Sequence, residues 1–432
     1  MAISTPKNYR NQVMYQIFVR NFSKDGTFKA VIPKLDAIRD LGVDIVWFAP
    51  IHPIGEKARK GSLGSPYAIK DYRGINPEYG TIEDFKKTVD AIHKAGMKCI
   101  IDVVYNHTSP DSVLANEHPE WFFHKEDGSF GNRVGDWTDI IDLDYANKEL
   151  WDYQIDTLKM WAEIVDGFRC DVAPLVPLDF WKRARCEVEK VRPGCIWLSE
   201  SIDPGFILTM RDLGLIAQSD CEMYEAFDIL YDYDIYSNLT EYVSGTGTLL
   251  SYSNAINRQE YIYPDNYCKL RFLENHDQPR ARFLFPKEKA LKNATAFLYF
   301  QKGMTLIYAG QEYGVSHLPS LFDKDTVEWK SKENIDLTDL MKRLYEIKQD
   351  PLFTDSTYRT KTYEDNVLKA IYSRGGNKII GIFSFKGEPG IIPINVADGK
   401  YENLIDHSTI EIMHGYVSLN GNPVIINTGR HM

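Results

Sequence analysis

Four short segments of the chain pass from an apolar run into a cluster of polar residues, and each carries at least one carboxylate. They are residues 102–107, 166–171, 197–200 and 272–277. An apolar run that ends in Asp, Glu, Arg or His is typical of a buried parallel strand that crosses a barrel and opens into an active site. Four such segments therefore predict a ring of parallel strands with polar side chains gathered at one mouth.

Strand-like and helix-like patterns alternate along most of the chain. The first apolar strand is expected at residues 13–19 and the eighth at 305–308, while residues 30–41 show the spacing of a helix. The sixth strand has the weakest pattern and is expected near residues 223–227. An alternation repeated about eight times favours a closed (β/α)8 barrel, a TIM barrel of the α/β class, over several separate domains.

Two regions differ from this alternation. Residues 108–138, after the third expected strand, form the longest irregular insertion and carry several aromatic side chains. After residue 352 helical periodicity is absent, and short strand-like runs lie between turn residues. The sequence therefore predicts a catalytic barrel over residues 1–352, with the insertion inside it, and a C-terminal all-β domain over residues 353–432.

The charge balance limits the expected partners. The chain has 50 basic and 61 acidic residues, a net charge of −11, and no run of basic residues. A nucleic-acid or anionic-membrane partner is not expected, since either requires a clustered positive face. No apolar stretch reaches the roughly 18 residues of a membrane span, and no signal peptide is visible. These features indicate a cytoplasmic protein, and they predict no particular oligomeric state.

Three carboxylates at expected strand ends, Asp171, Glu200 and Asp277, are predicted to meet at one mouth. A dense carboxylate cluster is the apparatus of glycosidic-bond hydrolysis. Arg169 lies two residues before Asp171, so its side chain should lie on the same side of the strand and keep Asp171 ionised. A single Asp at a strand end is more often a cap or an ion-pair partner, so the inference depends on all of these residues together.

The four segments resemble the signature regions of the α-amylase family of retaining glycoside hydrolases. Residues 65–81 are similar to that family's loop after the second strand, residues 140–145 to its fifth region and residues 306–312 to its eighth strand. The resemblance runs in order from about residue 13 to residue 312. It implies that the insertion is a short domain B that roofs the cleft, and that the C-terminal domain is a β-sandwich.

The resemblance also implies roles for individual residues. Asp171 matches the family's catalytic nucleophile, Glu200 its acid/base, and Asp277 the carboxylate that stabilises the transition state of a double displacement. Other matching positions are implied to bind or support the sugar. These residues are Tyr67, Asp102, His107, Arg169 and His276.

The reaction requires no cofactor, but a structural calcium ion is implied by two positions. Asn106 and Asp142 match side chains that hold Ca²⁺ between barrel and domain B in many family members, and their oxygens suit that ion. The family's further ligand falls at Leu175, where a His is frequent, so this chain departs from the pattern.

The function implied by the resemblance is retaining hydrolysis of α-glucosidic bonds in maltooligosaccharides or related α-glucans, with an oligosaccharide as the partner. Val172 and residues 277–280 resemble the branch that acts on short α-1,6-linked glucosides, so an oligo-1,6-glucosidase stays open. An α-glucosyl transferase or isomerase would use the same three carboxylates. A catalytically inactive, sugar-binding barrel is a further alternative. The sequence does not separate endo from exo action.

Overall fold

Eight parallel strands close into a barrel in a computed structural model that describes residues 4–135 and 137–429. Their order around the barrel is β1-β10-β9-β8-β7-β6-β3-β2. The predicted (β/α)8 barrel is therefore confirmed. The strands are β1 (Val13–Ile17), β2 (Ile45–Phe48), β3 (Lys98–Val103), β6 (Gly167–Cys170), β7 (Ile196–Ser199), β8 (Ile229–Tyr231), β9 (Lys269–Arg271) and β10 (Met304–Tyr308).

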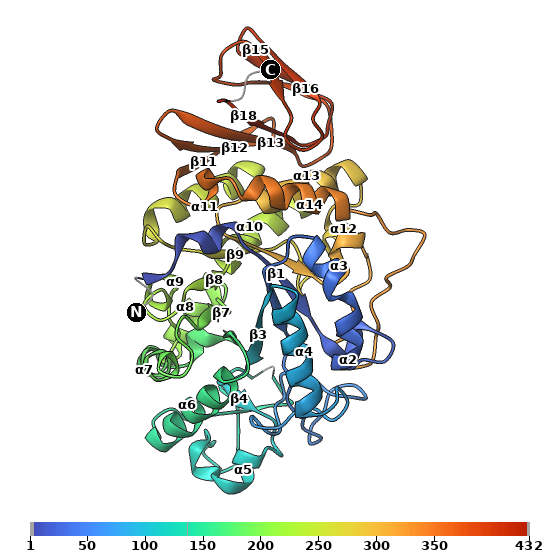
Figure 1. The fold of residues 1–432 in the computed structure, drawn as a ribbon. Coiled ribbons are helices and arrows are strands. Elements are labelled where there is room, and N and C mark those ends of the chain that lie inside the picture. Colours follow the sequence, from blue (N-terminus) through green and yellow to red (C-terminus); the bar gives the residue numbers. More distant parts are fainter. Residues whose placement is uncertain (1–3, 136, 430–432) are drawn as a thin grey trace.

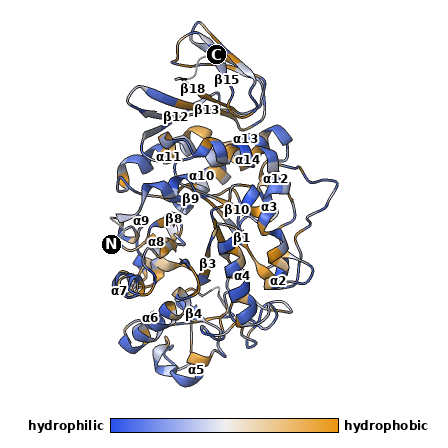
Figure 2. Ribbon diagram, viewed as in Figure 1, coloured by the Kyte–Doolittle hydropathy of each residue, from blue (hydrophilic) through white to orange (hydrophobic). Residues whose placement is uncertain are grey.

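Helices connect the strands and surround the barrel (Figure 1). Several of them show both hydrophilic and hydrophobic residues (Figure 2), as expected for helices with one buried face. The helices are α1 (Val19–Phe22), α2 (Phe28–Val31), α3 (Leu35–Asp40), α4 (Ile82–Lys94), α5 (Val113–Glu117), α6 (Lys148–Ala162), α7 (Leu178–Glu189), α8 (Pro204–Asp212), α9 (Asp220–Met223), α10 (Tyr233–Ser244), α11 (Leu249–Ile262), α12 (Ala281–Leu284), α13 (Glu288–Phe300) and α14 (Thr338–Lys348).

The expected helix over residues 30–41 is broken. It consists of α2, a 3-10 turn over Ile32–Lys34, and α3. Pro33 lies in that turn, where its ring and its missing N–H are incompatible with the interior of a continuous α-helix.

The sixth strand lies at β8, not at the predicted residues 223–227. Ser219 and Glu222 form a capping box that begins the short helix α9, and residues 220–223 are therefore helical. The apolar residues 229–231 that follow are fully buried and pair with both neighbouring strands. The predicted position of the sixth strand is wrong because the three residues of β8 are too few to show a clear apolar pattern.

The insertion after β3 contains little regular structure. It begins with β4 (His107–Thr108), includes α5, and returns through β5 (Ile141–Asp142). The two strands are antiparallel, and their register places His107 opposite Asp142. One side of the insertion is thereby fastened to the barrel mouth.

Two antiparallel four-stranded sheets form the C-terminal region, as predicted. Residues from both sheets share one apolar core, including Ile380 and Val417. Phe297 of α13 packs on Phe383 with ring centroids 5.3 Å apart, which joins this region to the barrel helices (Figure 1). The first sheet contains β11 (Thr357–Tyr363), β12 (Val367–Arg374), β13 (Asn377–Ser384) and β18 (Val424–Asn427), and the second β14 (Gly390–Pro393), β15 (Gly399–Glu402), β16 (Thr409–Met413) and β17 (Tyr416–Leu419).

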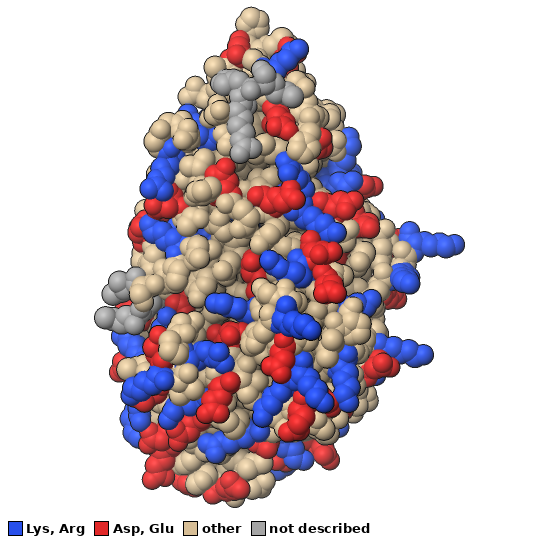
Figure 3. All heavy atoms as spheres, viewed as in Figure 1, with Lys and Arg blue, Asp and Glu red and all other residues tan. Residues whose placement is uncertain are grey.

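Charged side chains of both signs are intermingled over the face shown in Figure 3. Within residues 4–135 and 137–429, no helix has both the length and the apolar character that a membrane crossing requires.

Candidate active site

Three carboxylates lie at the mouth formed by the carboxyl ends of the barrel strands. Asp171 directly follows β6, Glu200 directly follows β7, and Asp277 lies in the loop after β9. Parallel strands all end on the same side of a barrel, so these positions share one face. Asp171 and Glu200 are only 6% and 8% exposed, whereas the side chain of Asp277 is 41% exposed. The mouth therefore holds two nearly dry carboxyl groups and one that is open to solvent.

Arg169 joins two of these carboxylates. Its Nη1 donates to Oδ1 of Asp171 at 2.8 Å, and its Nη2 lies 2.7 Å from Oε1 of Glu200. Nη1 also donates to Oδ1 of Asp102 at 2.9 Å, because the register of β3 on β6 places Asp102 beside Arg169. The guanidinium is completely buried. One buried cation thus holds three carboxylates in a fixed arrangement.

Burial sets the protonation of these groups. It raises the pKa of Glu200 to about 7, against the opposing charge of Arg169. It also raises the pKa of Asp171, so Arg169 limits that rise instead of producing a low pKa. Burial acts in the same direction on Asp277, but the charge of His276 and its hydrogen bond bring the pKa of Asp277 below its ordinary value. Near neutral pH, Glu200 is therefore protonated in a large share of molecules while Asp277 is ionised.

Three of the predicted sugar-binding residues form one connected group. The hydroxyl of Tyr67 donates to Oδ2 of Asp102 at 3.0 Å and lies 2.6 Å from Nε2 of His276. The rings of Tyr67 and His276 stack with their centroids 5.2 Å apart. Nε2 of His276 also lies 3.0 Å from Oδ2 of Asp277. The group therefore forms a continuous wall that ends at the exposed carboxylate.

His107 contacts the same centre from the start of the insertion. Its Nε2 lies 4.0 Å from Oδ2 of Asp171. Burial lowers the pKa of His107 to about 4, so the ring is neutral near pH 7 and offers one N–H donor. The ring of Trp137 lies 5.7 Å away, centroid to centroid. The structure thus brings all the predicted sugar-binding residues to the mouth.

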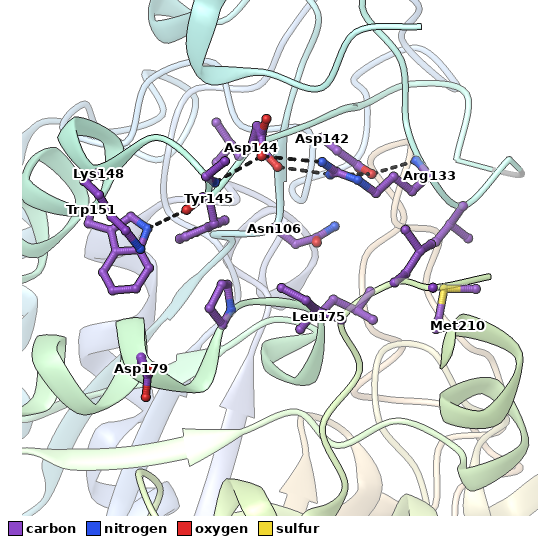
Figure 4. A pocket seen from close by; sticks show the side chains of 17 residues that line it. Asn106, Arg133, Asp142, Asp144, Tyr145, Lys148, Trp151, Leu175, Asp179 and Met210 are labelled. Atoms are coloured by element: carbon purple, nitrogen blue, oxygen red, sulfur yellow. Dashed lines mark hydrogen bonds and ion pairs between the residues drawn. The ribbon is translucent and has the colours of Figure 1, made fainter. Parts of the chain in front are cut away.

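The two predicted calcium ligands line one cavity of about 460 Å³ beside this centre, together with Leu175 (Figure 4). Oδ1 of Asp142 is buried without a hydrogen-bond partner among the described residues. The amide nitrogen of Asn106 lies 3.2 Å from Nδ1 of His107, which leaves its amide oxygen available to the cavity. Two unused oxygens of this kind fit a hard cation such as Ca²⁺, whose remaining ligands would be main-chain oxygens or water.

A positive charge lies on the other side of the same carboxylate. The main-chain N–H of Arg133 donates to Oδ2 of Asp142 at 2.7 Å, and the Arg133 guanidinium lies 3.7 Å from that oxygen (Figure 4). Because these contacts are made by Oδ2, they leave Oδ1 unengaged. Within the described parts of the chain, no group of three or more His, Cys, Asp or Glu side chains is arranged to hold a metal ion.

Two features of the site had no sequence signal. Val172 follows Asp171 with a left-handed backbone (φ 34°), and its N–H donates to Oε2 of Glu200 at 2.8 Å. β-Branched residues rarely adopt this conformation, so nothing in the sequence indicates it. The second is a buried ion pair between Arg280 and Glu274, 2.6 Å apart, which closes the loop that carries Asp277.

Two family models match this chain, one over the barrel region and one over the C-terminal region. A family model described as alpha amylase, catalytic domain, matches residues 12–137 and 115–364, and a model described as bacterial alpha amylase C-terminal domain matches residues 359–426. The alpha-amylase MalA of Haloarcula japonica is 29% identical over 316 residues, which are 70% of this chain and 44% of that protein. The chain spans less than half the length of the first curated relatives that it matches.

Solved structures match over almost the whole chain. An alpha-amylase from Lactobacillus plantarum is 48% identical, with a TM-score of 0.95, over 98% of this chain and 99% of that one. A noncanonic maltogenic alpha-amylase from Thermotoga neapolitana is 33% identical, with a TM-score of 0.85, over 97% and 99% of the two chains. Because the catalytic-domain model covers well over half of its residues, this chain belongs to the alpha-amylase family.

Proposed function

We propose that this protein is a retaining glycoside hydrolase that cleaves α-glucosidic bonds in maltooligosaccharides or related short α-glucans. The observation that carries the proposal is the pair Asp171 and Glu200, both nearly dry and both held by the guanidinium of Arg169. Hydrolysis with retention requires one carboxyl group that is ionised and another that is protonated on opposite faces of the same sugar. The raised pKa of Glu200 supports its role as the proton donor.

The first step forms a covalent intermediate. The ionised Asp171 attacks the anomeric carbon, while protonated Glu200 gives its proton to the departing glycosidic oxygen, which leaves as a hydroxyl of the shortened glucan. Arg169 keeps both carboxyl groups in position through this change. Asp277, ionised and open to the mouth, stabilises the positive charge that develops on the sugar ring.

The second step releases the sugar. Ionised Glu200 removes a proton from water, the resulting hydroxide attacks the anomeric carbon, and the bond to Asp171 breaks to restore its carboxylate. Two inversions leave the product with the configuration of the substrate. Another sugar hydroxyl in place of water would give a transferase product by the same steps, and product analysis with maltotriose distinguishes the two reactions.

A structural calcium ion fits this function without taking part in the chemistry. Asn106 and Asp142 would hold it through their unused oxygens at the side cavity. Since β5 carries Asp142 and pairs with β4, the ion would stiffen the contact between the insertion and the barrel mouth. His107, which reaches toward Asp171, would be held in place as a result.

The proposal also assigns a domain role to each region of the chain and a location to the protein. Residues 1–352 would form the catalytic domain, with residues 108–138 as domain B, and residues 353–432 a C-terminal β-sandwich. All six cysteines are free thiols. Thiols that stay reduced suit the cytoplasm, where we place the protein.

The dependence of activity on the length of the glucan tests the proposed function. Because the insertion over residues 108–138 is short, the cleft should contact only a few glucose units, and further units should make no additional contacts with the protein. kcat/KM should therefore rise over the first few units and then level off when maltose, maltotriose, panose, pullulan and soluble starch are compared. No turnover of any α-glucan would overturn the proposed function. Starch as the best substrate, with internal products, would contradict the preference for short chains, and a strong preference for panose would indicate α-1,6 action.

A further inference from the structure

Tyr233 lies at the barrel mouth, although no sequence motif assigns it a role. It is the first residue of α10, directly after the turn that follows β8. Its ring stacks on that of Tyr231 with centroids 5.3 Å apart, and the edge of Phe272 packs against it at 5.1 Å. The residue nevertheless stays partly exposed. The packing fixes the ring, and therefore the position of its hydroxyl.

A chain of two hydrogen bonds joins this hydroxyl to the main chain of Asp277, the residue that carries the third carboxylate. The main-chain N–H of Asp277 donates to Oδ1 of Asn275 at 2.8 Å, and Nδ2 of Asn275 donates to the hydroxyl of Tyr233 at 2.9 Å. Asn275 is completely buried. Tyr233 thus supports the backbone that presents Asp277.

The direction of each bond in the chain is determined. A main-chain N–H can only donate, so the amide oxygen of Asn275 must face Asp277 and its NH₂ must face Tyr233. Tyr233 is therefore the acceptor, and its one hydroxyl proton is not used in this bond. The side chain of Gln278 is a second hydrogen-bond partner of this hydroxyl, and it lowers the pKa of Tyr233 as a donating amide does, so this bond does not use the hydroxyl proton either.

The surroundings keep this proton on the oxygen. Burial raises the pKa of Tyr233 well above its ordinary value, and the negative charges of Asp277 and Glu200 raise it further. The hydroxyl is therefore a neutral donor near both carboxylates. A carbohydrate presents many hydroxyl oxygens, which are the acceptors that such a donor suits.

We propose that Tyr233 binds and positions the substrate. Its hydroxyl donates to a sugar hydroxyl of the glucan held between Glu200 and Asp277, and its hydrogen bond with Asn275 supports the main chain that carries Asp277. This inference rests on the proposed function, because it requires an α-glucan in the cleft. Loss of the hydroxyl removes one hydrogen bond to the substrate and leaves one N–H of the buried Asn275 without an acceptor. Both effects weaken substrate binding and the alignment of Asp277.

Tyr233→Phe tests the proposal, with Tyr236→Phe as its matched control. Tyr236 belongs to the same helix and stacks on Phe272 at 4.6 Å, but its hydroxyl donates to the main-chain oxygen of Leu273 and not to Asn275. Each variant removes one hydroxyl from the same aromatic cluster. We expect Tyr233→Phe to lower kcat/KM for maltotriose about 10-fold or more, with a higher KM as well as a lower kcat. Tyr236→Phe should stay within about twofold of the wild type.

Melting temperatures separate this role from a structural one. Partial unfolding lowers the active fraction, and therefore kcat, but leaves KM unchanged. Equal kcat/KM values for the two variants, or a loss in Tyr233→Phe confined to kcat and matched by a lower melting temperature, would overturn the inference. A wild-type protein without turnover would instead overturn the proposed function, so the two failures are distinguishable.

Discussion

Arg169 and Asp171 are two residues apart at the end of one strand, and Nη1 of Arg169 donates to Oδ1 of Asp171 at 2.8 Å. The spacing of two puts both side chains on one face of β6, toward the barrel mouth. The carboxylate is therefore held by its own strand, and no loop has to move to bring the pair together. This rigid geometry underlies the first prediction.

Asp171→Asn should fold normally and lose nearly all turnover. The amide keeps the shape of the side chain and can still accept from Arg169, but it cannot act as the nucleophile. We expect kcat to fall at least about 1,000-fold, measured with an aryl α-maltoside. Asp179→Asn, on α7, is the control and should retain wild-type activity. Wild-type turnover by the Asp171→Asn protein would refute the assignment.

The reaction should proceed with retention. Double displacement at Asp171 gives two inversions, so the first product released is the α-anomer. Proton NMR in the first minutes of maltotriose hydrolysis, before mutarotation, measures this directly. An initial β-anomer would mean a single displacement by water and would exclude a covalent intermediate.

The pH profile should be bell-shaped, with its alkaline limb set by Glu200. Its pKa is raised to about 7, so the proton needed for the first step is lost as the pH rises through that value. kcat/KM should then fall about tenfold per pH unit above it, while protonation of Asp171 sets the acid limb. Glu200→Gln should abolish the alkaline limb on a substrate whose activated leaving group needs no proton. An alkaline limb that persists in this variant would assign the acid to another residue.

Calcium removal should lower the thermal stability. A ligand that binds only the folded state stabilises it, so dialysis against EDTA should lower the melting temperature by several degrees, and Ca²⁺ should restore it. Asp142→Asn should lose this response because it weakens the oxygen donor at the cavity. Asp144→Asn, which removes a neighbouring carboxylate ion-paired with Arg133, should keep it. Equal melting temperatures in EDTA and Ca²⁺ for the wild type would rule out a structural calcium ion.

The parts of the fold that were predictable are those set by local pattern. The strand that leads to Asp102 is long, apolar and buried, and the capping box of Thr81 and Asp84 marks the start of α4. β8 was misplaced because its three residues carry too little pattern, and Pro33 divided a helix whose apolar spacing is otherwise regular. Local signals thus identify the long elements and fail at short ones.

The candidate site was predictable where function depends on side chains at strand ends, and not where it depends on backbone geometry or distant partners. Asp171 and Glu200 follow apolar runs directly, so their shared location follows from parallel strands. The contact between Tyr233 and Asn275 joins residues far apart in the chain, and although Asn275 lies in the segment 272–277, no sequence pattern pairs it with Tyr233. Only the closed barrel brings them together.

The hydrogen bond from the Val172 main chain to Glu200 has a consequence for how such an enzyme can diversify. The donor is a peptide N–H, which every residue except Pro supplies, so exchanging the side chain at this position leaves the bond available. Substitutions there can reshape the space next to the nucleophile while the proton donor keeps its partner. The left-handed backbone even favours Gly, which would widen that space without strain. Substrate choice and acid catalysis are thus separately adjustable at a single residue.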